Sequence, residues 1–199
     1  MADLQNLAAK NWHAGKVVYD WTALEDGVGS MAAGYKWAES NCVICIRFEL
    51  PAAAKSITLS FCNGQGGHTG NKNLRYKITA HEDTSFENAT SAIPGDGDFT
   101  LTGGDWARNT VTIQKNLLAG THYLYIWTNN SNQTGNVMWV QWVSGGKYEF
   151  TGTYEELAGT VPIKDATGVR PYHAYVKTAN GPALLTLYVK TADGPKLLS

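Results

Sequence analysis

The residues best suited to chemistry with another molecule lie in the aromatic stretch between Thr121 and Phe150. Tyr123, Tyr125 and Trp127 alternate along a run of β-forming residues, so on a strand they all point to one face. Aromatic faces stack on the apolar face of a sugar, and the amides that follow could bind its hydroxyls. A packed core or a subunit interface is the commoner role of such a stripe. The candidate residues for contact with a glycan or a partner are Tyr123, Tyr125, Trp127, Asn129, Asn130 and Trp106.

The acidic residues indicate turns and solvated loops more than catalysis. Asp96 and Asp98, separated by one glycine, resemble the start of a calcium loop, but no Glu follows at the EF-hand distance. Turn chemistry is the preferred interpretation, and these two residues remain a weak calcium candidate. The adjacent carboxylates at 25–26 and 155–156 would point apart on a strand. A glycosidase pair must instead face each other across about 5–9 Å.

The histidines, cysteines and serines form no arrangement typical of a metal site or a nucleophile. None of the 5 histidines has a paired ligand spacing, and no GxSxG motif occurs. Cys42 and Cys45 lie in a strand-like run at a spacing that puts them on opposite faces, so they cannot readily pair. We expect all three cysteines to be buried reduced thiols. We therefore expect a non-enzymatic protein with no metal and no cofactor.

The overall composition narrows the class of partner. The net charge is -1, from 16 basic and 17 acidic residues, which gives no electrostatic case for nucleic acid or an anionic membrane. No apolar run approaches the roughly 18 residues of a membrane span, and no secretory signal is visible. We expect synthesis in a cytoplasm and no membrane insertion. Charged residues are only 17% while Trp reaches 7, a composition that suits a subunit buried in an assembly.

Short alternating segments between Gly, Asn and Pro turns predict an antiparallel β protein. Strands are expected at 16–21, 35–38, 42–50, 56–62, 74–80, 99–101, 110–115 and 121–129. The core-facing residues expected in segments 42–50 and 56–62 are Ile44, Ile46, Phe48, Leu50, Ile57, Leu59 and Phe61. Residues 2–10 could form about two turns of helix, and residues 25–34 read as a loop. The predicted fold class is all-β, an antiparallel jelly-roll-like β-sandwich with a small C-terminal β-hairpin extension.

The stretch from Thr121 to Phe150 is predicted to form two long strands joined by a polar loop. The strands would cover residues 121–129 and 137–143, and neither has a purely polar face. One face would pack on a second sheet. The other would be covered by a ligand, a partner chain or another element of the protein, and what covers it is the functional question.

The C-terminal region contains an internal repeat. Tyr175–Leu185 reads YVKTANGPALL and Tyr188–Leu198 reads YVKTADGPKLL, an offset of 13 residues. The Asn-Gly and Asp-Gly pairs predict tight turns in a small meander of strands at 171–178, 183–191 and 196–199. Such strands are barely stable alone, so they must pack on the sandwich, on a copy of themselves or on a neighbouring subunit.

The repeat also sets the expected domain organisation. We expect the sandwich to span residues 1–155, and residues 156–199 to form a linker and a hairpin tail. The expected assembly residues of the tail are Tyr175, Lys177, Asn180, Gly181, Tyr188, Lys190, Asp193 and Gly194.

The Tyr-Val-Lys-Thr motif followed by glycine resembles the short C-terminal repeats of bacteriophage virion proteins associated with tails, baseplates or fibres. In those repeats the glycine precedes Trp-Lys, whereas this chain has Pro182 and Pro195. The preceding domain is similar in pattern to galactose-binding-like and carbohydrate-binding jelly rolls, through residues 98–106 and 117–129. The resemblance implies a virion structural protein with receptor or glycan contact.

We therefore expect a virion subunit of a tail, baseplate, fibre or decoration layer that works by assembling. Its expected partners are other virion proteins, copies of itself in homo-oligomers such as trimers, and a host glycan. One alternative is a carbohydrate-binding module or lectin-like protein. Another is a fragment of a secreted glycan-active hydrolase.

Overall fold

The computed structural model describes the sandwich almost continuously and the C-terminal region in short pieces. The described residues are 1–23, 30–36, 40–62, 72–103, 107–128, 138–141, 151–157, 161–165, 168–172, 175–178, 181–184, 188–191 and 194–197. Among them the fold is all-β, with one short 3-10 helix, η2 (Thr84–Asn88), and no α-helix. The predicted fold class is confirmed.

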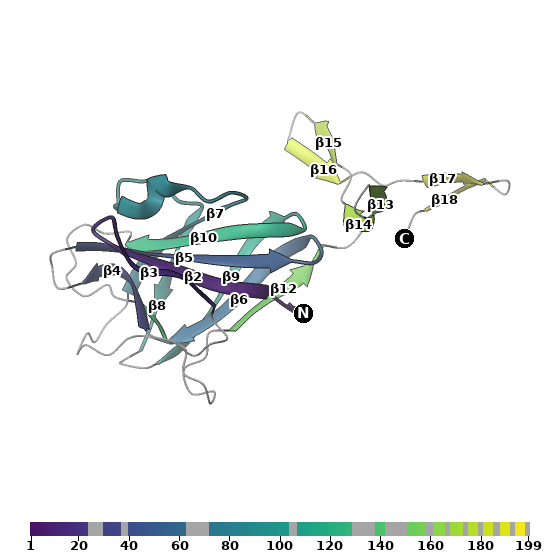
Figure 1. The fold of residues 1–199 in the computed structure, drawn as a ribbon. Coiled ribbons are helices and arrows are strands. Elements are labelled where there is room, and N and C mark those ends of the chain that lie inside the picture. Colours follow the sequence, from purple (N-terminus) through teal and green to yellow (C-terminus); the bar gives the residue numbers. More distant parts are fainter. Residues whose placement is uncertain are drawn as a thin grey trace.

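Two antiparallel sheets pack face to face (Figure 1). The smaller sheet has the order β1 (Ala2–Asp3), β12 (Thr151–Glu156), β6 (Ala54–Cys62), β9 (Arg108–Leu117). The larger sheet has the order β11 (Met138–Gln141), β4 (Ser30–Lys36), β5 (Ser40–Leu50), β10 (Gly120–Thr128), β7 (Lys72–Thr79), β8 (Gly97–Leu101). In addition, β2 (Gln5–His13) pairs with β5, and β3 (Lys16–Ala23) pairs with β2.

Successive strands cross repeatedly between the sheets, as in a jelly roll. The chain passes from β5 to β6, back to β7 and β8, across to β9, and back to β10. Its two long pairings are β6 with β9 and β10 with β5. This alternation gives every central strand a face toward the other sheet.

The inner core lies between the sheets and is built from alternate residues of these strands. Ile44, Ile46 and Phe48 of β5 are fully buried there, as are Ile57 and Leu59 of β6. The inward alternation predicted for these two strands is confirmed at these positions. The side chain of Phe61 lies outside the described ones.

The N-terminal residues form strands, so the prediction of a helix over residues 2–10 is wrong. β1 pairs with β12, and β2 inserts between β3 and β5. Ala8, Ala9 and Trp12 of β2 are buried. Hydrogen bonding on both edges and burial of these side chains outweigh the weak helix preference of Leu, Ala, Gln and Lys in this segment.

Two other segments differ from the predicted arrangement. β4 begins at Ser30, inside the predicted loop, and pairs with both β5 and β11. The two strands predicted between Thr121 and Phe150 correspond to β10 and β11, but β4 and β5 lie between them in the sheet. The connection between them is far longer than the two-residue turn that enforces pairing of neighbouring strands.

The outer face of the larger sheet carries a second hydrophobic cluster. We call it the outer cluster: Trp12, Val43, Cys45, Phe86, Ala89, Tyr125 and Trp127. Phe86 and Ala89 belong to residues 81–96, here named the cover segment, which connects β7 to β8 and contains η2. Figure 1 shows this segment lying across the outer face, beside β7 and β10. Asp83 accepts a hydrogen bond from the Ser85 N–H and so begins the helix.

The C-terminal region forms three separate two-stranded hairpins, and the predicted continuous meander is wrong. The hairpins are β13 (Val161–Asp165) with β14 (Gly168–Tyr172), β15 (Tyr175–Thr178) with β16 (Gly181–Leu184), and β17 (Tyr188–Thr191) with β18 (Gly194–Leu197). Among the described residues, each of these strands pairs only with the other strand of its own hairpin. The predicted strand at 183–191 is therefore divided between two hairpins.

Candidate binding groove

The aromatic stripe predicted to contact another molecule is divided by the cover segment. Tyr125 and Trp127 are fully buried in the outer cluster, whereas Tyr123 remains partly exposed. Phe86 stacks on Tyr125 with ring centroids 4.7 Å apart and lies 5.2 Å from the Trp127 ring. The prediction that Tyr125 and Trp127 bind a glycan or a partner is therefore wrong, because an element of the same chain covers them.

The polar atoms of the buried stripe are also satisfied from within the chain. The Tyr125 hydroxyl accepts a 2.7 Å hydrogen bond from the Asp83 N–H, and Trp127 Nε1 donates to the Thr90 carbonyl at 3.0 Å. Burial raises the pKa of Tyr125, and the neighbouring Cys45 raises it further. Burial likewise raises the pKa of the Cys45 thiol, despite its hydrogen bond with Tyr125. Both groups are therefore neutral and inert, as members of a packed core.

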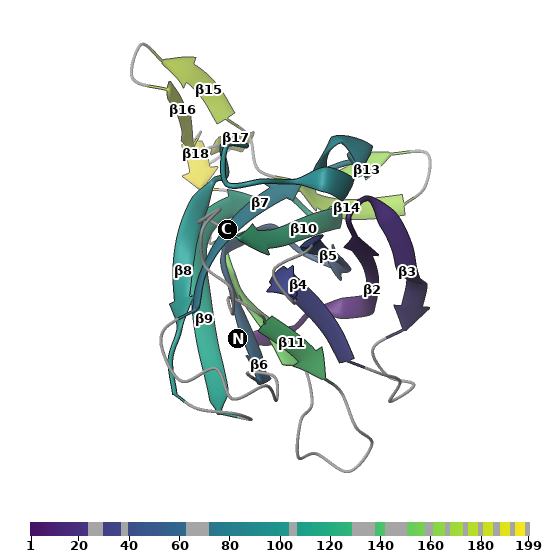
Figure 2. The same ribbon diagram turned by 90° about the vertical axis from the view of Figure 1, so that its left-hand side faces the viewer.

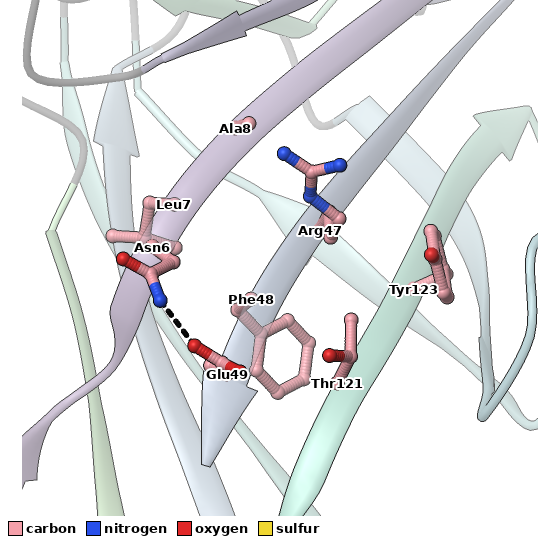
Figure 3. A pocket seen from close by; sticks show the side chains of 8 residues that line it. All are labelled: Asn6, Leu7, Ala8, Arg47, Phe48, Glu49, Thr121 and Tyr123. Atoms are coloured by element: carbon pink, nitrogen blue, oxygen red, sulfur yellow. Dashed lines mark hydrogen bonds between the residues drawn. The ribbon is translucent and has the colours of Figure 1, made fainter. Parts of the chain in front are cut away.

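A groove opens on the same outer face of the larger sheet, beyond the residues that the cover segment buries. It has a volume of about 510 Å³, and Figure 3 shows its lining side chains on β2, β5 and β10. The lining residues are Asn6, Leu7, Ala8, Arg47, Phe48, Glu49, Thr121 and Tyr123. The volume falls in the range of small-ligand pockets, about 300–1,000 Å³.

Strand register places the polar residues of the groove beside one another. Tyr123 of β10 is opposite Arg47 of β5, and Thr121 is opposite Glu49. Residues two apart share a face, so Arg47 and Glu49 both project outward, opposite to the core-facing set. β2 forms the third side of the groove, at the point where its pairing with β5 is irregular between Gln5 and Ala8.

The irregularity in β2 brings Asn6 to Glu49. Asn6 has φ 50, a left-handed conformation that Asn adopts more readily than most residues. Its side-chain amide donates a hydrogen bond to the Glu49 carboxylate (Figure 3). Thr121 is exposed and Glu49 is partly exposed.

Trp21 of β3 forms an aromatic and cationic cluster beside the groove. The Arg47 guanidinium lies 4.9 Å from its ring centroid, and the Tyr123 ring meets it edge-on at 5.9 Å. Lys10 lies 5.7 Å from the same ring and pairs with Glu82 at 3.4 Å. These contacts hold Arg47 and Tyr123 in place. No carboxylate lies within ion-pair distance of Arg47 among the described residues, so its N–H donors are available to a ligand.

Asp96 and Asp98 are bound by cationic side chains, so the weak calcium candidate is wrong. Lys115 donates to Asp96, Lys77 lies 3.7 Å from it, and Arg75 pairs with Asp98 at 2.9 Å. Burial alone would raise the pKa of Asp96. The hydrogen bonds from Lys115 and the Ile78 N–H, with the two lysine charges, outweigh burial and lower it. Within the described part of the chain, no group of three His, Cys, Asp or Glu could hold a metal ion.

The remaining predicted residues divide between two regions. Asn129, Asn130, Trp106, Asn180 and Asp193 lie outside the described residues. Tyr175 and Lys177 are in β15, Tyr188 and Lys190 in β17, and Gly181 and Gly194 begin β16 and β18. Cys42 and Cys45 are buried thiols that form no disulfide, as predicted.

Sequence reasoning missed most of the groove. The predicted core face of residues 42–50 leaves Arg47 and Glu49 on the opposite face, but no functional conclusion was drawn from them. The alternation along this strand could have identified them, because Arg47 and Glu49 are two charged residues on the same strand face as Val43 and Cys45. Asn6 was missed because its segment was assigned to a helix.

Comparisons with protein-family models, with curated proteins and with solved structures found no match to this chain. Among the described residues, no helix has the length and apolar character needed to cross a membrane.

Proposed function

We propose that the groove binds a neutral, hydroxyl-rich saccharide, and that the chain is a bacteriophage virion subunit that contacts the host surface through it. The single observation that carries the saccharide proposal is the juxtaposition of the Tyr123 ring with Arg47 and Glu49 in an open groove. The virion setting is supported by the Tyr-Val-Lys-Thr repeats of the tail and their resemblance to phage tail-associated proteins.

The chemistry of the groove favours a neutral sugar. Tyr123 offers an apolar platform for the carbon-bearing face of a sugar ring, and Trp21 stabilises its orientation edge-on at 5.9 Å. Arg47 supplies only donors, Glu49 only acceptors, and Thr121 both, which matches hydroxyl groups that donate and accept. One positive and one negative side chain leave the groove with no net charge. A strongly acidic or basic ligand therefore gains no general attraction.

The same residues argue for binding without cleavage. Glycoside hydrolysis uses two carboxyl groups that flank the bond. Glu49 is the single carboxylate among the groove-lining residues, and its amide partner Asn6 is not an acid. This favours a lectin-like role over the hydrolase alternative.

A glycan array with neutral and acidic saccharides tests the proposal. The wild-type chain should bind neutral saccharides, and Tyr123→Ala should weaken the best of them at least about tenfold, or about 1.4 kcal/mol. Tyr123→Phe keeps the ring and should bind nearly as the wild type does. Arg108→Ala, on β9 of the other sheet, is a matched control for Arg47→Ala.

Two results would overturn the saccharide proposal: no binding to any glycan, or binding that survives both Tyr123→Ala and Arg47→Ala. The virion setting has its own test, since peptides of this chain should be found by mass spectrometry in purified phage particles. Their absence from particles would remove the setting and leave the groove proposal standing.

A structural subunit that binds no glycan is the second candidate. The three C-terminal hairpins favour it, because repeated small elements outside the sandwich suit attachment to other subunits. Under that candidate the glycan array stays empty, while the peptides are still found in particles.

A further inference from the structure

The C-terminal tail contains a third copy of the repeat, in addition to the two that are evident from the sequence. The second strands of the three hairpins begin at Gly168, Gly181 and Gly194, at the same 13-residue offset that relates the two obvious copies. The residues opposite these glycines are Asp165, Thr178 and Thr191. The next register position holds a lysine in every hairpin: Lys164, Lys177 and Lys190. Residues 161–172 are therefore a diverged first repeat, and the tail is a tandem array of three equivalent hairpins.

Within the described part of the chain, each hairpin has no strand paired along either of its outer edges. Among the described residues, no tail strand pairs with a strand of the sandwich or of another hairpin. Figure 1 shows the three hairpins outside the two packed sheets. An isolated two-stranded hairpin is at best marginally stable in water. The array therefore needs strands from elsewhere to complete it.

The charges of the chain divide between the sandwich and the tail. Residues 161–199 contain five Lys or Arg and two Asp, a net charge of +3. Residues 1–160 contain eleven Lys or Arg and fifteen Asp or Glu, a net charge of -4. The two parts are electrostatically complementary, whereas two tails would repel each other. This complementarity favours contact between the tail of one copy and the sandwich of another.

An open strand edge in the sandwich provides a docking site for such a hairpin. Within the described chain, β3 pairs only with β2, and Figure 2 shows it at the outer border of the larger sheet. Val17 and Val18 of β3 are 51% and 46% exposed. Among the strand residues whose side chains are described, these two are the large hydrophobic ones that are exposed. The carboxylate of Asp20, in the same strand, lies 3.6 Å from the Lys10 ammonium and is 77% exposed. An exposed apolar edge of this kind is a template for pairing with another strand.

We infer that the tail is a trivalent docking array whose basic hairpins add as strands to the β3 edge of further copies of this chain. Strand addition supplies the backbone hydrogen bonds that the hairpins lack, and the valines supply apolar contact. Three equivalent hairpins let one chain hold more than one neighbour, which raises the strength of the assembly without a new kind of contact. This inference is independent of the saccharide groove.

Intersubunit complementation between full-length chains tests the inference. Val18→Lys places a charge on the β3 edge and should prevent a hairpin from docking there. A triple variant with Lys164, Lys177 and Lys190 changed to Glu should disable the array. Leu118→Lys, at an exposed hydrophobic residue of similar exposure beyond β9, is the matched control. Sedimentation velocity should show that the wild type and Leu118→Lys both assemble. Val18→Lys and the triple variant should each sediment as monomers.

The mixture of the two defective variants gives the decisive result. An equimolar mixture should regain association, because the first variant retains intact tails and the second retains intact β3 edges. Wild-type association should weaken at least about tenfold between roughly 0.05 and 0.5 M salt, since screening weakens opposite charges. Hydrogen exchange at the β3 amides should also speed up when the wild type is diluted.

Four outcomes of the sedimentation measurements would overturn the inference. They are a monomeric wild type, unchanged assembly in Val18→Lys, no association in the mixture, or an assembly that strengthens with salt. The last would indicate association between tails. Because the exchange measurement uses the unaltered chain, it stands even if a variant folds poorly: protection of β3 that does not depend on concentration would also refute the docking.

Discussion

Replacing Phe86 with alanine should destabilise the whole sandwich by about 3–5 kcal/mol. Phe86 is 5% exposed, stacks on Tyr125 and packs at a tilt against Trp127, so the substitution removes its burial and two aromatic contacts. Burying a phenylalanine contributes about 1.5–3 kcal/mol, and each aromatic pair adds roughly 0.5–1.5 kcal/mol. Phe→Ala substitutions in packed cores cost about 3–5 kcal/mol, in agreement with that sum.

The comparison with Tyr125→Phe separates packing from hydrogen bonding. That variant keeps the ring and loses only the hydroxyl that accepts from the Asp83 N–H, so it should cost about 1 kcal/mol. Urea unfolding followed by tryptophan fluorescence and far-UV circular dichroism measures both variants. The two signals should give coincident transitions with unchanged slope.

A cost below about 1 kcal/mol for Phe86→Ala, with unchanged slope, would refute this reasoning. It would mean that the cover segment contributes no packing to the native state. A fluorescence transition that precedes the dichroism transition would instead show that the cover segment detaches before the sheets separate. The groove should then enlarge, because its border with the outer cluster would be lost.

Three further predictions follow from buried or paired ionisable groups. In a variant that retains Cys45 as its single cysteine, the native thiol should react with a disulfide reagent at pH 8 at least about a hundredfold more slowly than in urea, because burial raises its pKa. Lys115→Met should cost about 1 kcal/mol at pH 7, since the lowered pKa of Asp96 stabilises the fold above its unfolded value of about 3.9. This cost should shrink as pH falls through the folded pKa of Asp96, as urea unfolding at pH 7 and pH 3 can measure. Burial lowers the pKa of His122, so its contribution is present above about pH 6.5 and is lost as pH falls below it. His122→Gln should remove that part of the loss of stability between pH 7 and pH 5.

Each of these predictions has an outcome that contradicts it. Fast reaction of native Cys45 would show that the outer cluster opens. A cost of Lys115→Met that is equal at pH 3 and pH 7 would show that Asp96 is not its partner in solution. An identical pH dependence in His122→Gln and wild type would assign the acid sensitivity to other groups.

The inner core could be predicted from sequence because its pattern is local. In β5 and β6 the alternation of Ile and Leu with polar residues defines the inward face by itself. β2 was mispredicted because its sequence, Gln-Asn-Leu-Ala-Ala-Lys, has no β-branched residue and favours a helix slightly. Its strand conformation depends on pairing with β3 and β5, which no local pattern reveals.

The candidate site was only half predictable for the same reason. Periodicity correctly put Tyr123, Tyr125 and Trp127 on one face, opposite to the inner core. It could not show that Phe86, about forty residues earlier in a segment rich in turn formers, would cover two of the three. The third repeat escaped notice because Lys164 and Gly168 are among its few residues shared with the other copies. The common hairpin register makes the relation visible.

The pairing of β1 with β12 has a consequence for how the chain is made. Ala2 lies opposite Tyr154, so the first strand of the sandwich cannot find its partner until the last strand has been synthesised. Contacts of such long sequence separation slow folding, and a nascent chain leaves the ribosome from its N-terminus. The hairpin tail then emerges just as the sandwich becomes able to close. The strand addition that we propose for the tail would thereby be deferred until each newly made copy has a completed sheet edge.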